Sequence, residues 1–248
     1  RPLRAPAQLG GRPLWALRPK VPHNGPLLLY LHGGAYVLNV MRVHWQFLSQ
    51  LLDALPATIV VADYPLAPQA TAVDTFAYMA TLYQYLQTQY PQQPMTIMGD
   101  SAGGGLAIAF AQTLRDQQRL LPRQIIALSP WLDVALQHPD VAVLAPKDLL
   151  LKPASLRQAG ALYAGQLPLD DPRVSPIHGD FEGLPPLHLF IGTHDLLAAD
   201  AQALKTKLRQ QQLPLHYYEY PNMIHAWMLL PVKEGQTVLK QIVAILQS

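Results

Sequence analysis

Short apolar runs alternate along the chain with longer segments in which apolar residues recur at helical spacing. Most of the runs are typical of strands that are buried on both faces of a parallel sheet. The expected strands cover residues 12–17, 26–31, 58–62, 94–98, 124–128, 187–191 and 215–220. The expected helices cover residues 42–55, 73–89, 102–119, 199–211 and 231–246. This alternation predicts the α/β class, with an open, mostly parallel sheet and helices on both of its faces.

The alternation is interrupted between residues 134 and 185. Prolines are scattered through this part of the chain, and the helical pattern is confined to short pieces such as residues 153–163. We interpret residues 134–185 as an excursion above the sheet that forms part of a lid. Because 248 residues is the length of one α/β domain, the sequence predicts a single domain over residues 1–248 with this excursion inside it.

A Gly-x-Ser-x-Gly motif joins the expected strand at residues 94–98 to the helix that follows. Ser101 lies at the centre of the motif, between Gly99 and Gly103. A strand, a sharp turn and a helix around such a motif form a nucleophile elbow, in which a strained backbone exposes the serine and close crossing requires small neighbours. The free N–H groups at the start of the helix favour negative charge at the same point. The motif therefore predicts Ser101 as a nucleophile.

Two further candidates also follow expected strands. Asp195 comes after the strand at 187–191, and His225 comes after the strand at 215–220. Ligand sites in open α/β sheets lie beyond the carboxyl ends of the strands, so we expect these side chains near Ser101. The chain order Ser, Asp, His is the order of this scaffold. A nucleophile, a base and a carboxylate that orients the base are what acyl transfer requires.

Other titratable residues fit these roles less well. His194 directly precedes the candidate acid, and His216 lies within an expected strand, where a half-buried structural histidine is the common case. Asp200 opens an expected helix, so a charge or cap at the helix N-terminus accounts for it. Asp100 precedes the serine, and we expect it to accept a hydrogen bond that holds a loop in place.

A second glycine-containing loop follows the strand at 26–31. Small residues after a strand allow backbone N–H groups to turn toward a site, so Gly33, Gly34 and Ala35 are candidate donors to an oxyanion, together with Ala102 after the serine. His32 begins this loop, and we expect it to hold the loop in position without transferring protons.

Composition excludes several classes of function. Charged residues make up 14% of the chain and the formal net charge is +2, so nothing indicates nucleic-acid binding. No apolar stretch is long enough to predict membrane insertion. The chain has no cysteine, and a reducing, cytoplasmic location is our expectation. No histidine has a carboxylate at metal-ligand spacing on a helix face, so we predict no metal and no cofactor. The sequence leaves a homodimer open.

The motifs together resemble the hormone-sensitive-lipase-like branch of the α/β hydrolases, a group of small-ester carboxylesterases. The matching stretches are His32–Ala35, Asp63–Pro68, Gly99–Gly104, Ser129–Asp133, Asp171–Pro176, Leu184–Leu187, Asp195–Asp200 and His225. The resemblance implies a triad of Ser101, Asp195 and His225. It also implies oxyanion donors in the loop of residues 33–35 and at Ala102.

Three features depart from the family pattern. Ala35 stands where a third glycine is usual, and Ala226-Trp227 follows His225 where Gly-Phe is usual. Family members also often carry a helical N-terminal cap, whereas about 25 residues precede the strand at 26–31 here. The cap is therefore either absent or outside this sequence.

These observations predict a serine carboxylesterase that hydrolyses small, short-acyl esters through an acyl-enzyme. We expect Tyr36, Trp131 and Trp227 to line a shallow pocket for the small-molecule ester. Two alternatives stay open at this point. One is an arylformamidase-like amide hydrolase on the same scaffold, and the other is a ligand-binding member of the fold that has lost catalysis.

Overall fold

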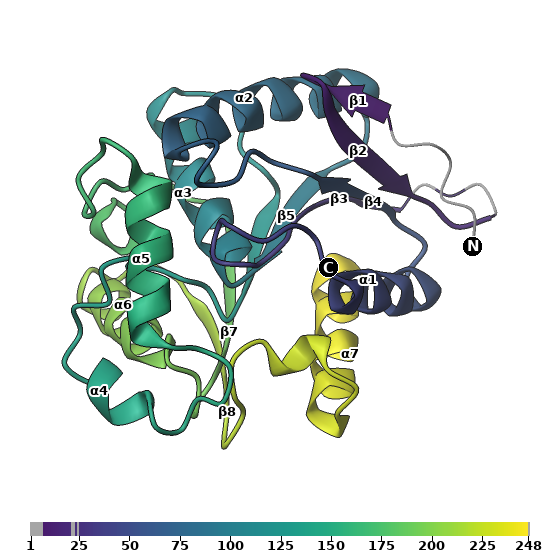
Figure 1. Cartoon of the computed structure of the whole chain (residues 1–248). Coiled ribbons are helices and arrows are strands. Elements are labelled where there is room, and N and C mark those ends of the chain that lie inside the picture. Colours follow the sequence, from purple (N-terminus) through teal and green to yellow (C-terminus); the bar gives the residue numbers. More distant parts are fainter. Residues whose placement is uncertain (1–6, 21–22, 24, 248) are drawn as a thin grey trace.

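One sheet runs through the molecule and positions everything else (Figure 1). The computed structural model describes residues 7–20, 23 and 25–247, which contain eight strands in the order β1-β2-β4-β3-β5-β6-β7-β8. The strands are β1 Ala7–Leu9, β2 Arg12–Leu17, β3 Leu27–Leu31, β4 Thr58–Ala62, β5 Met95–Asp100, β6 Gln124–Leu128, β7 Leu187–Gly192 and β8 His216–Tyr220. β2 pairs antiparallel with β1 and β4, and all other pairs are parallel. The predicted mostly parallel sheet is confirmed.

Helices cover both faces of this sheet, as the sequence predicted. They are α1 Arg42–Ala54, α2 Ala72–Gln89, α3 Ala102–Asp116, α4 Val141–Leu144, α5 Pro153–Ala164, α6 Ala198–Gln210 and α7 Lys233–Gln247. Side chains of α2, α3 and α6 join one apolar core, and side chains of α1 and α7 join a second core on the opposite face. Successive side chains of β3 point to opposite faces of the sheet and so contribute to both cores. Leu27 and Leu29 belong to the first core, and Leu28 and Tyr30 belong to the second.

The register of the strands places their carboxyl ends level with one another. Leu31 of β3 pairs with Gly99 of β5, and Asp100 of β5 pairs with Leu128 of β6. Farther along, Leu128 pairs with Phe190 of β7. The loops that leave β3, β5, β6 and β7 therefore begin side by side at one edge of the sheet.

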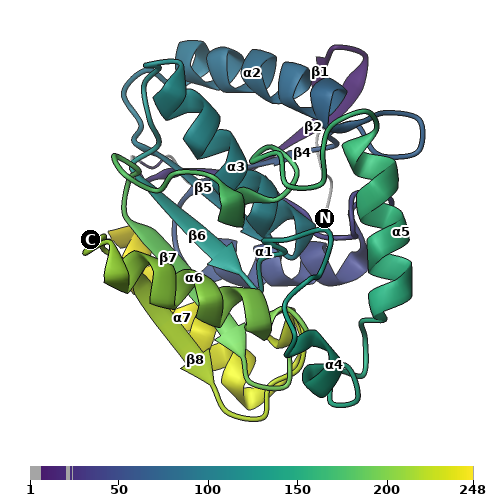
Figure 2. The same ribbon diagram turned by 90° about the vertical axis from the view of Figure 1, so that its left-hand side faces the viewer.

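Residues 134–185 lie on the same side of the sheet as α3 and α6 (Figure 2). They contain α4, α5 and a short 3-10 turn, Pro176–His178. Tyr163 at the end of α5 stacks on Tyr36 with ring centroids 3.6 Å apart. Gly160 allows α5 to approach closely, because a Cβ there would lie 2.7 Å from Cβ of Val134. That this segment acts as part of a lid stays a prediction.

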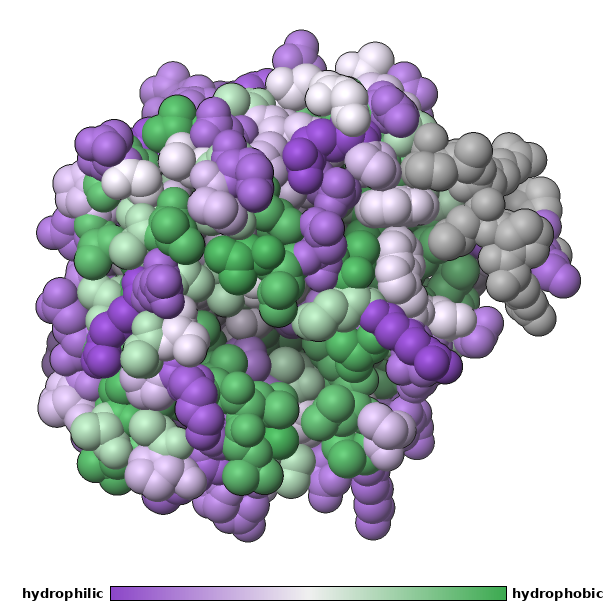
Figure 3. All heavy atoms as spheres, in the orientation of Figure 1, coloured by the Kyte–Doolittle hydropathy of each residue, from purple (hydrophilic) through white to green (hydrophobic). Residues whose placement is uncertain are grey.

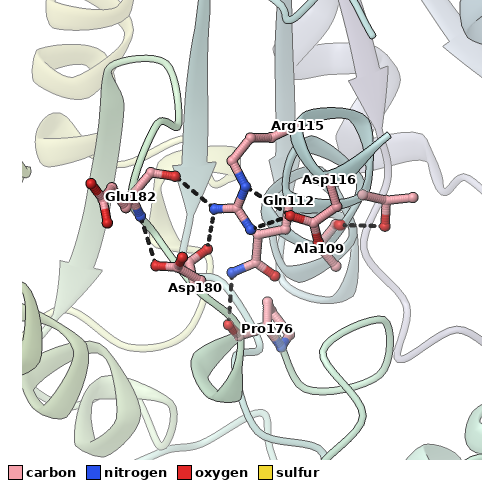
Figure 4. Close-up of polar contacts among 8 residues, drawn as sticks. Ala109, Gln112, Arg115, Asp116, Pro176, Asp180 and Glu182 are labelled. Atoms are coloured by element: carbon pink, nitrogen blue, oxygen red, sulfur yellow. Dashed lines mark hydrogen bonds and ion pairs between the residues drawn. The ribbon is translucent and has the colours of Figure 1, made fainter. Parts of the chain in front are cut away.

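The returning end of the excursion is held against α3 by polar contacts (Figure 4). Nη1 of Arg115 donates to the backbone oxygens of Asp180 and Glu182, at 2.7 Å each. One turn earlier, Nε2 of Gln112 donates to the oxygen of Pro176 at 3.0 Å. These contacts position the segment that leads into β7. In the described part of the chain, no helix is long and apolar enough to cross a membrane.

We expect Arg115→Ala to lower the free energy of unfolding by about 2 kcal/mol, because hydrogen bonds from a charged donor contribute about 1.5–3 kcal/mol. Urea denaturation would measure the loss. Arg209→Ala is the matched control, since Arg209 is an exposed arginine on α6, and its loss should cost less than about 0.5 kcal/mol. Equal stability of the two variants would show that the Arg115 contacts do not hold the excursion in place.

Candidate active site

Ser101 lies between β5 and α3 in a backbone conformation that side chains rarely adopt. Its φ is 52° and its ψ is −120°. Such a conformation costs about 1–3 kcal/mol and persists only where the surroundings enforce it. Its N–H donates to the oxygen of Leu128 at 2.9 Å, and its own oxygen accepts from the N–H groups of Gly105 and Trp131. Contacts on both sides therefore hold the turn.

The two motif glycines allow the chain to cross itself at this turn. A Cβ on Gly103 would lie 2.0 Å from the oxygen of Leu31, and a Cβ on Gly99 would lie 2.3 Å from the oxygen of Gly103. No larger residue fits at either position without moving backbone. The requirement for small residues that the sequence motif indicated thus has a direct steric cause.

Asp100 holds the glycine loop against the serine turn. Its Oδ1 accepts from the N–H of Gly33 at 2.9 Å and from the hydroxyl of Tyr30 at 2.6 Å. The loop-holding role expected of Asp100 is confirmed. The same contact corrects one expectation, because the N–H of Gly33 is occupied by Asp100 and is not available to an oxyanion.

Three other expected donors have no partner of their own. Within the described residues, the N–H groups of Gly34, Ala35 and Ala102 make no hydrogen bond. Ala35 has a φ of 53°, and Gly34 has a φ of 126°. Ala102 begins α3, where the helix dipole favours an anion. Ala102 directly follows Ser101. Gly34 and Ala35 lie in the loop after β3, and their neighbour Gly33 adjoins the serine, since a Cβ on Gly33 would lie 3.0 Å from Cβ of Ser101.

His32 lies beneath the loop in a role that needs no proton transfer. Its Nδ1 donates to the oxygen of Gly33 at 2.8 Å, and its ring stacks on Tyr64 at 4.5 Å. Burial lowers the pKa of His32, which keeps the ring neutral. The loop-holding role expected of His32 is confirmed.

Asp195 and His225 form a buried pair. Nδ1 of His225 lies 3.0 Å from Oδ2 and 3.1 Å from Oδ1 of Asp195. Oδ1 also accepts from the N–H of Leu197 at 2.9 Å. Burial alone would lower the pKa of His225. The charge and hydrogen bond of Asp195, together with the charges of Asp148 and Asp100, outweigh burial and raise this pKa above its usual value. The carboxylate thus fixes Nδ1 as the protonated nitrogen and leaves Nε2 as the basic one.

The histidine loop is tied to the loop after β6. The N–H of Ala226 donates to Oγ of Ser129 at 3.2 Å, and the N–H of Ser129 donates to the oxygen of Phe190. Because Leu128 receives the N–H of Ser101, the same strand end holds both the serine turn and the histidine loop. Ser129 was not among the candidate site residues, although it begins one of the stretches that carry the family resemblance and follows a strand directly.

A second carboxylate that the sequence did not indicate also reaches this region. Oδ2 of Asp148 accepts from the N–H of Leu196, next to Asp195, at 2.8 Å. Asp148 belongs to the excursion, 47 positions before Asp195. Three leucines follow Asp148 in the sequence, and this pattern does not indicate the contact with Leu196.

Asp200 does not act as the expected helix cap. It is the third residue of α6, it is buried, and its Oδ2 has no hydrogen-bond partner in the described residues. Burial, with a contribution from Asp133, raises its pKa to about 7. It makes no contact with His225 of the kind that Asp195 makes, so the geometry favours Asp195 as the partner of the imidazole.

The three aromatic residues expected in the pocket are packed in the cores instead. Tyr36 and Trp131 belong to the core around α3 and are 1% and 0% exposed, while Trp227 belongs to the core of α1 and α7 and is 1% exposed. Tyr36 stacks between Tyr163 and Trp131. In this structure the three side chains therefore contact other protein groups and present almost no surface to a ligand. Of the three, only Tyr36 has a positive backbone φ.

Comparisons with known proteins agree with this architecture. Residues 28–229 match the family described as alpha/beta hydrolase fold. An acetyl-hydrolase of Streptomyces hygroscopicus is 35% identical over 82% of this chain and 69% of its own length. An esterase of Acinetobacter venetianus is 31% identical over 79% of this chain and 66% of its own length. The solved structure of an esterase from the bacterial hormone-sensitive lipase family has a TM-score of 0.88 and 30% identity, covering 99% of this chain and 86% of that one.

We expect Gly33→Ala to reduce turnover strongly, because the new Cβ would lie 2.2 Å from Oδ2 of Asp100 and 3.0 Å from Cβ of Ser101. The loop must move away from the serine turn, and a displacement of about 1 Å at a reacting centre costs about 100-fold. Steady-state hydrolysis of p-nitrophenyl acetate measures the loss.

Ala35→Gly is the control in the same loop. It keeps the backbone donor and removes a Cβ from a positive φ, so we expect activity within about threefold of the unmodified protein. Normal activity of Gly33→Ala, or collapse of Ala35→Gly, would contradict this account of the loop.

Proposed function

The chain belongs to the hormone-sensitive-lipase-like branch of the alpha/beta hydrolase fold family, and from this membership we propose that it is a serine carboxylic ester hydrolase. The observation that carries the proposal is the buried Asp195–His225 pair, held at the same sheet edge as the strained turn of Ser101. A serine, an oriented imidazole and unpaired backbone donors are together the machinery of acyl transfer.

In the proposed reaction, Oγ of Ser101 attacks the ester carbonyl carbon while its proton passes to Nε2 of His225. The carbonyl oxygen becomes an oxyanion, which accepts hydrogen bonds from the N–H groups of Gly34, Ala35 and Ala102. Each such donor contributes about 3–4 kcal/mol to the transition state. The alcohol leaves with the proton from His225, so Ser101 is acylated. A water molecule, deprotonated by His225, then attacks the acyl carbon, the bond to Oγ of Ser101 breaks and releases the acid, and His225 returns the proton to Oγ.

The role of Asp195 in this scheme is electrostatic and orienting. Its carboxylate favours the imidazolium that forms when His225 takes a proton, which is why the pKa of His225 is raised. The base must be neutral to act, so activity falls as the pH drops through this pKa. The acidic limb of the pH profile of kcat/KM thus reports on His225.

We propose short-acyl esters as the substrate class. The name of the Streptomyces relative, an acetyl-hydrolase, supports this choice. The face drawn in Figure 3 is hollowed near its middle, and many of the side chains around the hollow are apolar. We propose dissolved esters in the cytoplasm as the working substrate.

We expect Ser101→Ala to fold normally and to lose ester hydrolysis by at least about 10⁴-fold, because the nucleophile is gone while the oxyanion donors stay. A fluorophosphonate probe should label the unmodified protein at Ser101 and should not label the variant. Ser49→Ala, an exposed serine on α1, is the control and should keep full labelling.

The same experiment distinguishes the remaining candidates. Absence of labelling and turnover in the unmodified protein would indicate a ligand-binding member of the fold. Labelling at Ser101 with faster hydrolysis of N-formylkynurenine than of any p-nitrophenyl ester would indicate an arylformamidase.

We expect kcat/KM to be highest between acetyl and butyryl esters and to fall steeply by octanoyl, since each methylene that does not fit forfeits about 0.8 kcal/mol of binding or more. A series of p-nitrophenyl esters, measured below and above their solubility limits, tests this expectation. A maximum at about ten carbons, or a rate increase once the ester forms droplets, would show a larger and more mobile cover over the site.

A further inference from the structure

Asp148 is a buried carboxylate that the proposed reaction does not yet use. It lies in the excursion between α4 and α5 and is 2% exposed, although the next two residues, Leu149 and Leu150, are 76% and 55% exposed. A carboxylate buried within an exposed turn needs specific partners, because removing its charge from water is costly.

Both oxygens of Asp148 are satisfied, and each has a different function. Oδ1 accepts from the N–H groups of Leu150 and Leu151, at 2.8 and 3.1 Å, which fixes the carboxylate relative to its own turn. Oδ2 points away from the turn and accepts from the N–H of Leu196 at 2.8 Å. The side chain therefore joins the excursion to the loop after β7.

That loop also carries the acid of the proposed triad. The N–H of Leu196 donates to Asp148, and the N–H of the next residue, Leu197, donates to Asp195 at 2.9 Å. Two carboxylates are thus held by consecutive amides of one loop at the start of α6. If the carboxylate of Asp148 moves, the amide of Leu196 to which it is bonded moves with it, and this amide directly follows Asp195.

We propose that Asp148 is a positioning residue for the Asp195–His225 pair: it holds the acid loop in place and adds a second negative charge near the imidazolium. The inference rests on the proposed ester hydrolysis and deepens it. It makes residues 134–185 part of the acid–base machinery and not only a cover for the substrate.

The charges that act on His225 agree with this role. Three carboxylates favour its protonated form: Asp195 with the largest effect, then Asp148, then Asp100 from beneath the serine turn. Burial acts in the opposite direction. Loss of the Asp148 charge should therefore lower the pKa of His225, so the acidic limb of kcat/KM should move to lower pH.

A purely structural role for Asp148 makes a different prediction. A turn acceptor contributes to the stability of the excursion but exerts no influence on the titration of His225. The two roles are separated by the isosteric variant Asp148→Asn, which removes the charge and retains an oxygen for the turn.

Asp133→Asn is the matched control. Asp133 is also buried, and its carboxylate accepts from the backbone N–H groups of Ala135 and Gln137. Asp133 is not among the carboxylates whose charge raises the pKa of His225. Both variants lose a buried, backbone-bonded carboxylate, but only one loses a contact with the acid loop.

The experiment measures three quantities in the unmodified protein, Asp148→Asn and Asp133→Asn. These are the pH profile of kcat/KM for p-nitrophenyl acetate, the urea midpoint, and the titration of His225 by NMR of ¹³C-labelled histidine, with His225→Gln to assign its signal. We expect Asp148→Asn to lower the His225 midpoint and the acidic limb by roughly 0.5–1 pH unit and to lower kcat about tenfold with little change in KM. Asp133→Asn should lose stability with an unchanged midpoint.

Unchanged titration of His225 in Asp148→Asn would overturn the inference, whatever the loss of stability. If Asp148→Asn does not fold, Asp148→Ser, which keeps a hydroxyl acceptor, takes its place under the same criterion. The NMR titration does not depend on turnover. An unmodified protein that neither reacts with the fluorophosphonate nor hydrolyses esters would therefore refute the proposed function, while the shift in midpoint would still decide the role of Asp148.

Discussion

The close crossing of α3 over the end of β3 is the constraint on which the rest of the site depends. Gly103 lies so near the backbone of Leu31 that even a methyl group would overlap it. This contact fixes the distance between the serine turn and the loop that leaves β3. The unusual backbone angles of Ser101 follow from it, because the chain has to reverse direction within one residue between β5 and α3. The strain is local, and it is maintained by the buried parallel strands on either side.

The buried carboxylate of Asp100 stabilises the contact between the serine turn and the loop that leaves β3. Asp100 receives hydrogen bonds from Gly33 and Tyr30, and Nε2 of His44 lies 3.4 Å from its Oδ2. Nδ1 of His44 accepts from the N–H of Met41, so the ring proton is on Nε2 and faces the carboxylate. Burial would raise the pKa of Asp100, yet these partners together hold it below its usual value. Asp100 therefore stays ionised, and the amide of Gly33 is used for structure while the next two amides stay free.

Much of the fold could be predicted from the sequence because its signals are local. A continuous apolar run such as residues 27–31 specifies a strand with both faces buried, and Gly-x-Ser-x-Gly specifies a crossing that only small residues allow. The pairing of Asp195 with His225 also followed from strand order, since successive parallel strands end at one edge. That these residues catalyse the reaction stays a proposal for experiment.

The missed features depend on contacts between distant parts of the chain. The inward orientation of Tyr36 arises from a positive φ and from stacking on Tyr163, which is 127 positions later. Asp200 lies in the first turn of α6, as expected, but its burial depends on how α6 packs, and it makes no capping hydrogen bond within the described residues. Asp148 contacts a backbone amide, and no side-chain pattern encodes such a partner.

Charged side chains bind the excursion to the rest of the protein at several places. Lys207 of α6 donates to the backbone oxygens of Ile177 and Gly179, and two further places involve Arg115 and Asp148. Arg115 holds its returning end to α3, and Asp148 holds its middle to the loop of Asp195. A segment bound only at its two ends could open without disturbing the chemistry. This one also contacts the acid loop, so a displacement large enough to break the Asp148 contact would release the amide next to Asp195 and remove a negative charge from near His225. If residues 134–185 cover the site as we propose, access to the site and the basicity of the imidazole would be coupled through the carboxylate of Asp148.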